Sequence, residues 1–111
     1  MTASTIDLLQ GTLDVLVLKA LSWTPLHGFE ITTWLEDRSG GHLAVDDAAL
    51  FQALHRMEER GLIVAEWGVT ENNRRARYYS LTAKGRSHLK AEAASLTQYA
   101  RTLTTILAAR A

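Results

Sequence analysis

Three arginines and two asparagines stand close together in segment 72–77, whose sequence is Asn-Asn-Arg-Arg-Ala-Arg. Guanidinium groups donate charge-assisted hydrogen bonds to phosphate oxygens, and asparagines favour tight turns. A helical pattern at 46–61 and an apolar run at 62–67 precede this segment, and a tyrosine-rich run at about 75–81 overlaps its end. This order of helix, strand, basic turn and strand is the core of a winged helix-turn-helix. Such a module puts one helix in the DNA major groove and a charged turn against the backbone.

The predicted helix at 46–61 has a buried side and an exposed side. Its apolar residues recur at helical spacing and predict the buried side as Leu50, Ala53, Leu54 and Met57. We expect residues of the opposite side and of the turn to contact DNA: Ala48, Gln52, His55, Arg56, Asn73, Arg74, Arg75 and Arg77. A structural alternative stays open, because exposed polar residues on a helix are usually only solvated and arginines also protect exposed strand edges.

The other elements must hold this helix and turn in place. An apolar stripe between Ile6 and Leu21 predicts a first helix, which begins either at a Ser4-Asp7 cap or with Thr12 as its cap. Pro25 favours an extended break, and a second helix is predicted from about 27 to 38. For the third helix the predicted cap is Asp46, with Val45 and Leu50 as a hydrophobic staple and Gly61 as the terminator. The run at 62–67 is bounded by Gly61 and Gly68, which predicts a strand.

A long last helix is predicted after Thr82. Apolar residues repeat along it every seven positions, in a seam made of Leu89, Ala93, Leu96, Ala100, Leu103 and Leu107. Because little domain core would remain for such a seam to cover, we expect a second copy of the chain to pack on it. The alternative is that this helix folds back on its own domain. The predicted fold is mainly α with a small β-hairpin, comprising a winged helix-turn-helix domain at 1–82 and a dimerisation helix at 83–111.

Composition fits one domain with a DNA partner. The 111 residues are 47% hydrophobic, and the chain lacks cysteine, so no disulfide or thiolate site is expected. The net charge of zero is unevenly distributed: residues 1–65 carry four Lys or Arg against nine Asp or Glu, whereas residues 66–90 carry six against two. Local positive charge suffices for phosphate contact, because salt screens charges beyond about 8–10 Å. The start has no positive charge typical of a signal peptide and no run is long enough to span a membrane, so a cytoplasmic protein is expected.

Enzyme and metal functions have little support in the sequence. It contains no phosphate-binding glycine loop, nucleophile elbow or metal triad, so neither an enzyme nor a cofactor is expected. Two histidines, His27 and His55, each stand three residues before a glutamate, but two ligands are too few for a metal site. The tryptophans at 23, 34 and 67 are expected in the core or in an interface.

Several segments resemble the PadR family of bacterial transcriptional regulators. They are Leu-Leu-Gln-Gly-Thr-Leu-Asp at 8–14, Pro-Leu-His-Gly-Phe at 25–29, Ala-Leu-His-Arg-Met-Glu at 53–58, Glu-Trp-Gly at 66–68 and Asn-Asn-Arg-Arg-Ala-Arg-Tyr-Tyr-Ser-Leu-Thr at 72–82. The resemblance covers roughly residues 8–90. It implies a winged-helix domain, a dimer held by the C-terminal helix, and repression that small molecules relieve in some members. The single C-terminal helix is similar to that of the shorter members.

The chain departs from the family pattern in the helix expected to contact DNA. Where the family often has Gly-Ser-Leu-Tyr-Pro-Ala-Leu, residues 48–54 are Ala-Ala-Leu-Phe-Gln-Ala-Leu. Phosphate contacts through the missing serine and tyrosine hydroxyls are therefore not carried over. Gln52 adds an amide, which can bond adenine bidentately, so an operator different from that of relatives is expected.

The predicted function is a homodimeric, sequence-specific DNA-binding regulator that acts as a repressor on an inverted repeat. An aromatic or apolar effector is expected between the two chains, partly from the resemblance and partly because Ala93 and Ala100 leave space beside Tyr99. The alternative function is a winged-helix protein-interaction module that does not bind DNA.

Overall fold

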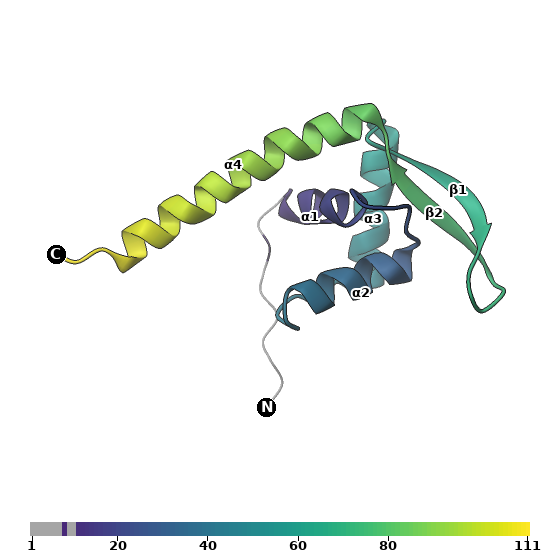
Figure 1. Cartoon of the computed structure of the whole chain (residues 1–111), viewed down its shortest axis with the longest axis horizontal. Coiled ribbons are helices and arrows are strands. Elements are labelled where there is room, and N and C mark those ends of the chain that lie inside the picture. Colours follow the sequence, from purple (N-terminus) through teal and green to yellow (C-terminus); the bar gives the residue numbers. More distant parts are fainter. Residues whose placement is uncertain (1–7, 9–10) are drawn as a thin grey trace.

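A computed structural model describes residue 8 and residues 11–111. Its elements in chain order are α1 (Thr12–Ala20), α2 (Gly28–Arg38), α3 (Asp47–Glu59), β1 (Ile63–Val69), β2 (Arg75–Leu81) and α4 (Ala83–Ala108). Helices α1, α2 and α3 gather around one core, the hairpin of β1 and β2 projects from one side, and α4 extends away on the other (Figure 1). The predicted architecture, helical with one small hairpin, is confirmed.

The core lies between the first three helices and the base of the hairpin. The predicted buried side of α3 is confirmed, since Leu50, Ala53, Leu54 and Met57 are all buried. These side chains meet apolar residues from α1, α2, β1 and β2, namely Val17, Leu18, Ile31, Leu35, Ile63 and Tyr79. The core therefore fixes how α3 and the hairpin are oriented relative to each other.

Local capping sets the helix ends. Asp46 accepts a hydrogen bond from the backbone N–H of Ala49 at 2.8 Å, and Gly61 follows α3 in the left-handed region, with φ of 73°. Both features agree with the sequence prediction. Helix α1 begins with Thr12 as its first helical residue and Gly11 as its N-cap, one residue before the predicted cap. The other predicted start, at Ser4 and Asp7, lies outside the described residues.

The hairpin is longer than its sequence pattern indicated. Gly68 was expected to end the first strand, yet it lies inside β1, opposite Ala76. The reason is the neighbouring ring, because a Cβ atom at position 68 would lie 2.8 Å from the ring of Tyr78. An unpredicted contact extends the sheet on its other edge: Leu26 forms an antiparallel bridge with Tyr79. This bridge ties the extended segment after Pro25 to the base of β2.

Helix α4 divides into a packed half and a projecting half. Thr82 caps it, as predicted, by accepting a hydrogen bond from the N–H of Gly85. Leu89 is buried and Leu96 is half-buried against the core. The first part of the seam therefore packs on its own domain, and only the later part is fully available to a second copy of the chain. Beyond residue 96 every residue of α4 is exposed. None of the helices in the described part of the chain is long and apolar enough to span a membrane.

Candidate nucleic-acid interface

The exposed side of α3 presents the residues that the sequence singled out. Ala48, Gln52 and His55 are all exposed, at spacings of four and three residues, which place them on one face. His55 Nε2 lies 3.1 Å from a carboxylate oxygen of Glu59 one turn later. The face therefore carries a methyl group, an amide and an imidazole, which can approach a groove of the duplex without first breaking a core contact.

Arg56 points toward α1. Its guanidinium lies 2.8 Å from a carboxylate oxygen of Asp14, whose side chain is mostly buried. The pair joins α1 to α3, two helices that are 42 residues apart at this contact. This partner gives Arg56 a structural role in the free protein, in addition to the DNA contact expected from its place on the helix.

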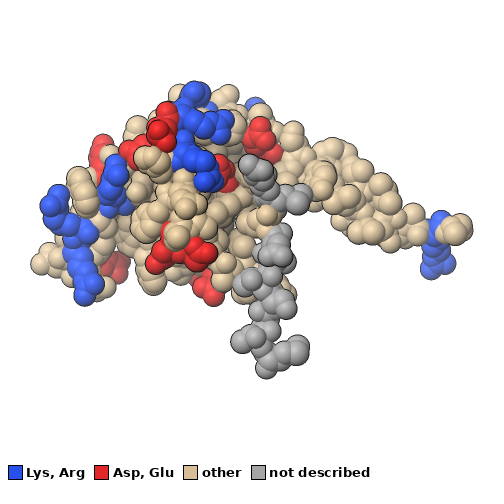
Figure 2. Space-filling view, turned by 180° about the vertical axis from the view of Figure 1, so that it is seen from behind, with Lys and Arg blue, Asp and Glu red and all other residues tan. Residues whose placement is uncertain are grey.

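The tip of the hairpin is held by a network of short-range hydrogen bonds. Thr70 donates its N–H to the carbonyl of Arg74 at 2.8 Å and accepts the N–H of Asn73 at 2.9 Å. Asn73 adopts a left-handed conformation with φ of 59°, which asparagine tolerates better than most residues. Lys and Arg side chains gather at this end of the molecule (Figure 2). The turn at residues 71–73 thus places Arg74 directly after the tip, opposite Thr70.

The three arginines of the hairpin have different surroundings. Arg77 lies 3.0 Å from a carboxylate oxygen of Glu58 on α3, whereas Arg75 stacks over the ring of Trp67 at 4.6 Å from its centroid. Among the described residues, no carboxylate lies within 4.0 Å of Arg74 or Arg75. Two of the three guanidinium groups therefore keep their charge available to an anionic partner.

Tyr79 lies near the ion pair of Arg77 and Glu58, at the base of the hairpin. Burial raises the pKa of its phenol above the ordinary value; the nearby Arg77 lowers it, and Glu58 raises it. The guanidinium of Arg77 stands 5.8 Å from the centre of the Tyr79 ring. The side chain of Arg77 is thus held between α3 and the sheet rather than at the tip.

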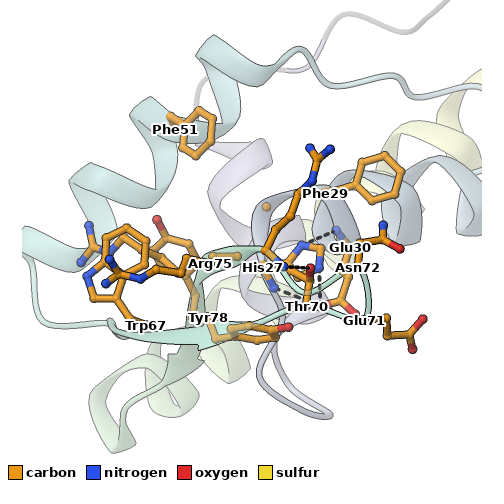
Figure 3. A pocket seen from close by; sticks show the side chains of 15 residues that line it. His27, Phe29, Glu30, Phe51, Trp67, Thr70, Glu71, Asn72, Arg75 and Tyr78 are labelled. Carbon is orange, nitrogen blue, oxygen red and sulfur yellow. Dashed lines mark hydrogen bonds and ion pairs between the residues drawn. The ribbon is translucent and has the colours of Figure 1, made fainter.

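A groove of about 810 Å³ separates the starts of α2 and α3 from the hairpin. Arginines 74, 75 and 77 line it together with exposed aromatic side chains, of which Phe29, Phe51 and Trp67 are the largest (Figure 3). Trp67 is 63% exposed and Trp23 is 67% exposed, so neither lies in the core, and of the two expected positions only an interface stays open for them. A cation lies over each ring: Lys19 over Trp23 and Arg75 over Trp67. Trp34 is partly buried against the core.

His27 is occupied in the structure of α2. It accepts the N–H of Glu30 on Nδ1, while Glu30 accepts the N–H of His27, which makes a capping box. The imidazole also meets Tyr78 edge to face, with centroids 5.3 Å apart. Within the described residues no three potential ligands gather closely enough to hold a metal ion. Helix capping therefore accounts for this histidine and its glutamate.

The comparisons with known proteins agree with this geometry. A profile of the PadR-like family of transcriptional regulators matches residues 17–91. The chain belongs to this family. Its members are DNA-binding transcriptional regulators and not enzymes. The sequence resemblance and the winged-helix prediction are thus confirmed.

Solved PadR-like structures superpose on most of the chain. A PadR-like transcription factor from Bacteroides fragilis is 27% identical, with a TM-score of 0.70 over 86% of this chain and 90% of that one. A PadR family regulator from Eggerthella lenta is 25% identical, with a TM-score of 0.74 over 91% and 86%. One from Bacillus cereus shares the fold at 23% identity, with a TM-score of 0.78 over 91% and 96%.

A second groove in this PadR-like chain lies between α1 and α4. Its volume is about 610 Å³, and its lining combines apolar side chains with three cations: Val15, Leu16, Leu89, Ala93, Leu96, Lys19, Arg86 and Lys90, together with Thr97. Tyr99, the residue expected to orient an effector, is half-exposed further along α4 and does not line this groove. The structure therefore separates the space beside Ala93 from the ring of Tyr99.

Proposed function

We propose that this protein is a homodimeric repressor that binds an inverted-repeat operator through α3 and the hairpin. The observation that carries the proposal is the pairing of two features across one groove. Phe51 of α3 lines the groove together with Arg74 and Arg75 of the hairpin. Gln52 and His55 are exposed on the same helix as Phe51. A duplex that receives α3 in its major groove would bring its phosphates to the hairpin.

The hairpin and α3 have different roles in this proposal. Arg74 and Arg75 bond phosphate oxygens and fix the position of the protein, which adds affinity for any sequence. Gln52 and His55 face the base edges, where the Gln52 amide can bond adenine at N6 and N7. Asn73 supports the turn, and Ala48 lets the helix approach closely because its side chain is a single methyl group.

The projecting half of α4 is the proposed dimer contact. Ala100, Leu103 and Leu107 continue the seven-residue repeat, and Leu103 and Leu107 are exposed in the single chain together with Ile106. Exposed leucines at seam positions favour pairing with a second helix of the same kind. Leu89, Ala93 and Leu96 contribute to the first part of the seam while also packing on α1. Two copies joined in this way would present two α3 helices to a two-fold operator.

A small apolar or aromatic effector is part of the same proposal. The space along Ala93 and Leu96 supports it, since ligand sites are mostly apolar with few polar groups. Tyr99 does not line this space within one chain, so a part in effector binding would require the second chain of the proposed dimer. An effector releases the operator only if it binds the DNA-free arrangement more tightly. Titration of planar aromatic compounds against the free protein and the operator complex, followed by tryptophan fluorescence, tests this part.

Salt-dependent binding to duplex DNA tests the central claim. Replacing both Arg74 and Arg75 by alanine should weaken binding to all sequences alike, and should flatten the plot of log affinity against log salt by about 0.9 for each phosphate that is no longer neutralised. Arg38→Ala is the matched control, because it removes a cation from the end of α2 remote from the groove. Unchanged affinity and slope in the double variant would contradict the role of the hairpin. No binding to duplex DNA by the unaltered chain would favour the protein-interaction alternative.

A further inference from the structure

The groove between α3 and the hairpin has an apolar side that phosphate contact does not use. Three aromatic side chains that line it remain open to solvent: Phe29 is 77% exposed, Phe51 is 54% exposed and Trp67 is more than half exposed. Large apolar side chains that cluster in the open mark a binding surface. Of the three rings, only that of Phe51 belongs to α3, the helix proposed to enter the major groove.

The position of Phe51 on α3 brings its ring to the base edges. It follows Ala48 by three residues and directly precedes Gln52, so it borders the exposed face in the second turn of the helix. The first turns of such a helix approach the bases most closely. The ring packs beside the start of α2, where a Cβ atom on Gly28 would lie 3.8 Å from two of its carbons. Across the hollow stand Trp67 and Arg75 (Figure 3).

A phenyl ring selects among bases by what it lacks. It has no hydrogen-bond donor or acceptor, and thymine alone among the standard bases presents an apolar group, the 5-methyl, in the major groove. Packing the ring on the polar edge of guanine, adenine or cytosine would displace water without replacing its hydrogen bonds. Packing it on a methyl group buries apolar surface on both partners.

We propose that Phe51 is a specificity-determining residue that contacts the 5-methyl group of a thymine in each operator half-site. The inference rests on the proposed function, because it takes α3 to lie in the major groove. Charge complementarity favours duplex DNA as the occupant, since Arg74 and Arg75 line the opposite side of the same groove. The phenyl ring thus supplies a thymine contact beside the base contacts of Gln52.

The test removes the methyl group and nothing else. Duplexes that bind the full chain are selected from a random library, and each thymine of the selected site is then replaced by deoxyuridine. Affinity should fall roughly fourfold for the contacted thymine in one half-site, and roughly fifteenfold when both half-sites are changed, as expected for one buried methyl group each. The contacted T·A pair is then exchanged for C·G, and this C·G pair for 5-methylcytosine·G. The second exchange should raise the affinity roughly fourfold, because the methyl group of 5-methylcytosine occupies the same place as that of thymine.

Two variants assign the effect to the ring. Phe51→Ala should bind thymine and deoxyuridine duplexes equally, whereas Phe29→Ala, which removes a more exposed ring from the same groove, should keep the wild-type ratio. Each ratio compares two duplexes with one variant, so a general loss of affinity or stability cancels. Wild-type protein indifferent to deoxyuridine at every thymine, or a Phe51→Ala variant that keeps the ratio, would overturn the proposal.

The remaining outcomes separate this proposal from the proposed function. Selection of no duplex at all would overturn both. Tighter binding to a single strand than to its duplex would overturn the thymine contact alone and assign the rings to base stacking. Duplex binding in which the ratio of affinities for the thymine and deoxyuridine duplexes depends on Phe51 supports both the proposed function and the thymine contact.

Discussion

Gly85 stands where the first turn of α4 touches the backbone after α3. A Cβ atom at this position would overlap the carbonyl oxygen of Leu62. The same close approach allows the N–H of Thr82 to donate to that carbonyl at 3.1 Å and its hydroxyl to donate to the carbonyl of Gly61 at 2.7 Å. Lys84 Nζ adds a third bond, to the carbonyl of Arg60 at 2.8 Å. The start of α4 is therefore docked on the end of α3 through a contact that requires glycine.

Gly85→Ala should lower the free energy of unfolding by about 3 kcal/mol. Moving α4 away to relieve the overlap weakens three hydrogen bonds, each worth about 1 kcal/mol. It also loosens the packing of Leu89, which is only 9% exposed and whose full burial is worth about 2 kcal/mol. Against these unfavourable terms, alanine in place of glycine favours the helix by about 1 kcal/mol. If about half of the Leu89 packing is retained, these terms combine to a loss of about 3 kcal/mol in the free energy of unfolding.

Urea unfolding measures this effect at one fixed protein concentration, because the proposed dimerisation would make the midpoint depend on concentration. Gly28→Ala is the matched control, since Gly28 also stands in the first turn of a helix. A Cβ atom there would meet Leu50 and Phe51 at 3.5 and 3.8 Å, which are ordinary contacts. Its stability should stay the same or rise by up to about 1 kcal/mol. If Gly85→Ala were as stable as Gly28→Ala, the docking of α4 on Leu62 would be refuted.

Three further outcomes are expected. Glu58→Gln should tighten DNA binding and steepen its salt dependence by about one unit of slope, since it releases Arg77 for a phosphate; an unchanged slope would leave Arg77 a structural role only. Glutamate at both Leu103 and Leu107 should give a folded monomer by sedimentation, because both side chains are exposed in the single chain; a persistent dimer would place the interface elsewhere. Burial raises the pKa of Tyr79, so its contribution to stability is present below about pH 10, the ordinary tyrosine pKa, and is lost as the pH rises toward the folded pKa. In the Tyr79→Phe variant the free energy of unfolding should fall less steeply as the pH rises above about 10. A pH profile identical to that of the unaltered chain would contradict the role of Tyr79.

The parts of the fold that sequence patterns predicted are those set by local interactions. The caps at Asp46 and Thr82 each bond a backbone N–H three residues ahead, and Gly61 needs only its own left-handed conformation. Such contacts follow from residues a few positions apart, so a single sequence is enough to predict them. The buried side of α3 is similar, because helical periodicity alone determines which residues face inward.

The surroundings of the candidate nucleic-acid interface were less predictable, because the ion pairs of its arginines join residues far apart in the sequence. Arg56 meets Asp14 and Arg77 meets Glu58, pairs that are 42 and 19 residues apart. No local pattern distinguishes these two arginines from Arg74, which has no carboxylate partner among the described residues. Gly68 failed as a strand end for the same reason, since only the register of β2 shows that Tyr78 needs the missing side chain.

The seven-residue repeat in α4 had a similar limit. Periodicity predicted an apolar face along this helix, but it could not indicate which surface covers each part of that face. Leu89 packs on its own domain, whereas Leu107, at a seam position eighteen residues later, is almost fully exposed. The difference arises because α1 is short and ends opposite the first half of α4. The outer half of this apolar stripe, which extends beyond α1, is the part proposed to pair with a second copy of the chain.

The ion pairs on the DNA side also bear on how such a protein would distinguish its operator. With Arg56 and Arg77 paired with carboxylates, the hairpin has two arginines without a carboxylate partner among the described residues, Arg74 and Arg75, and these are the proposed phosphate contacts. Affinity for arbitrary DNA depends on the number of phosphates neutralised, at about 0.9 of salt slope for each, so this contribution is small. A chain with zero net charge gains little more from its overall field. In the proposed complex, discrimination would therefore depend chiefly on the exposed side of α3, where Gln52 is proposed to supply hydrogen bonds and Phe51 an apolar contact.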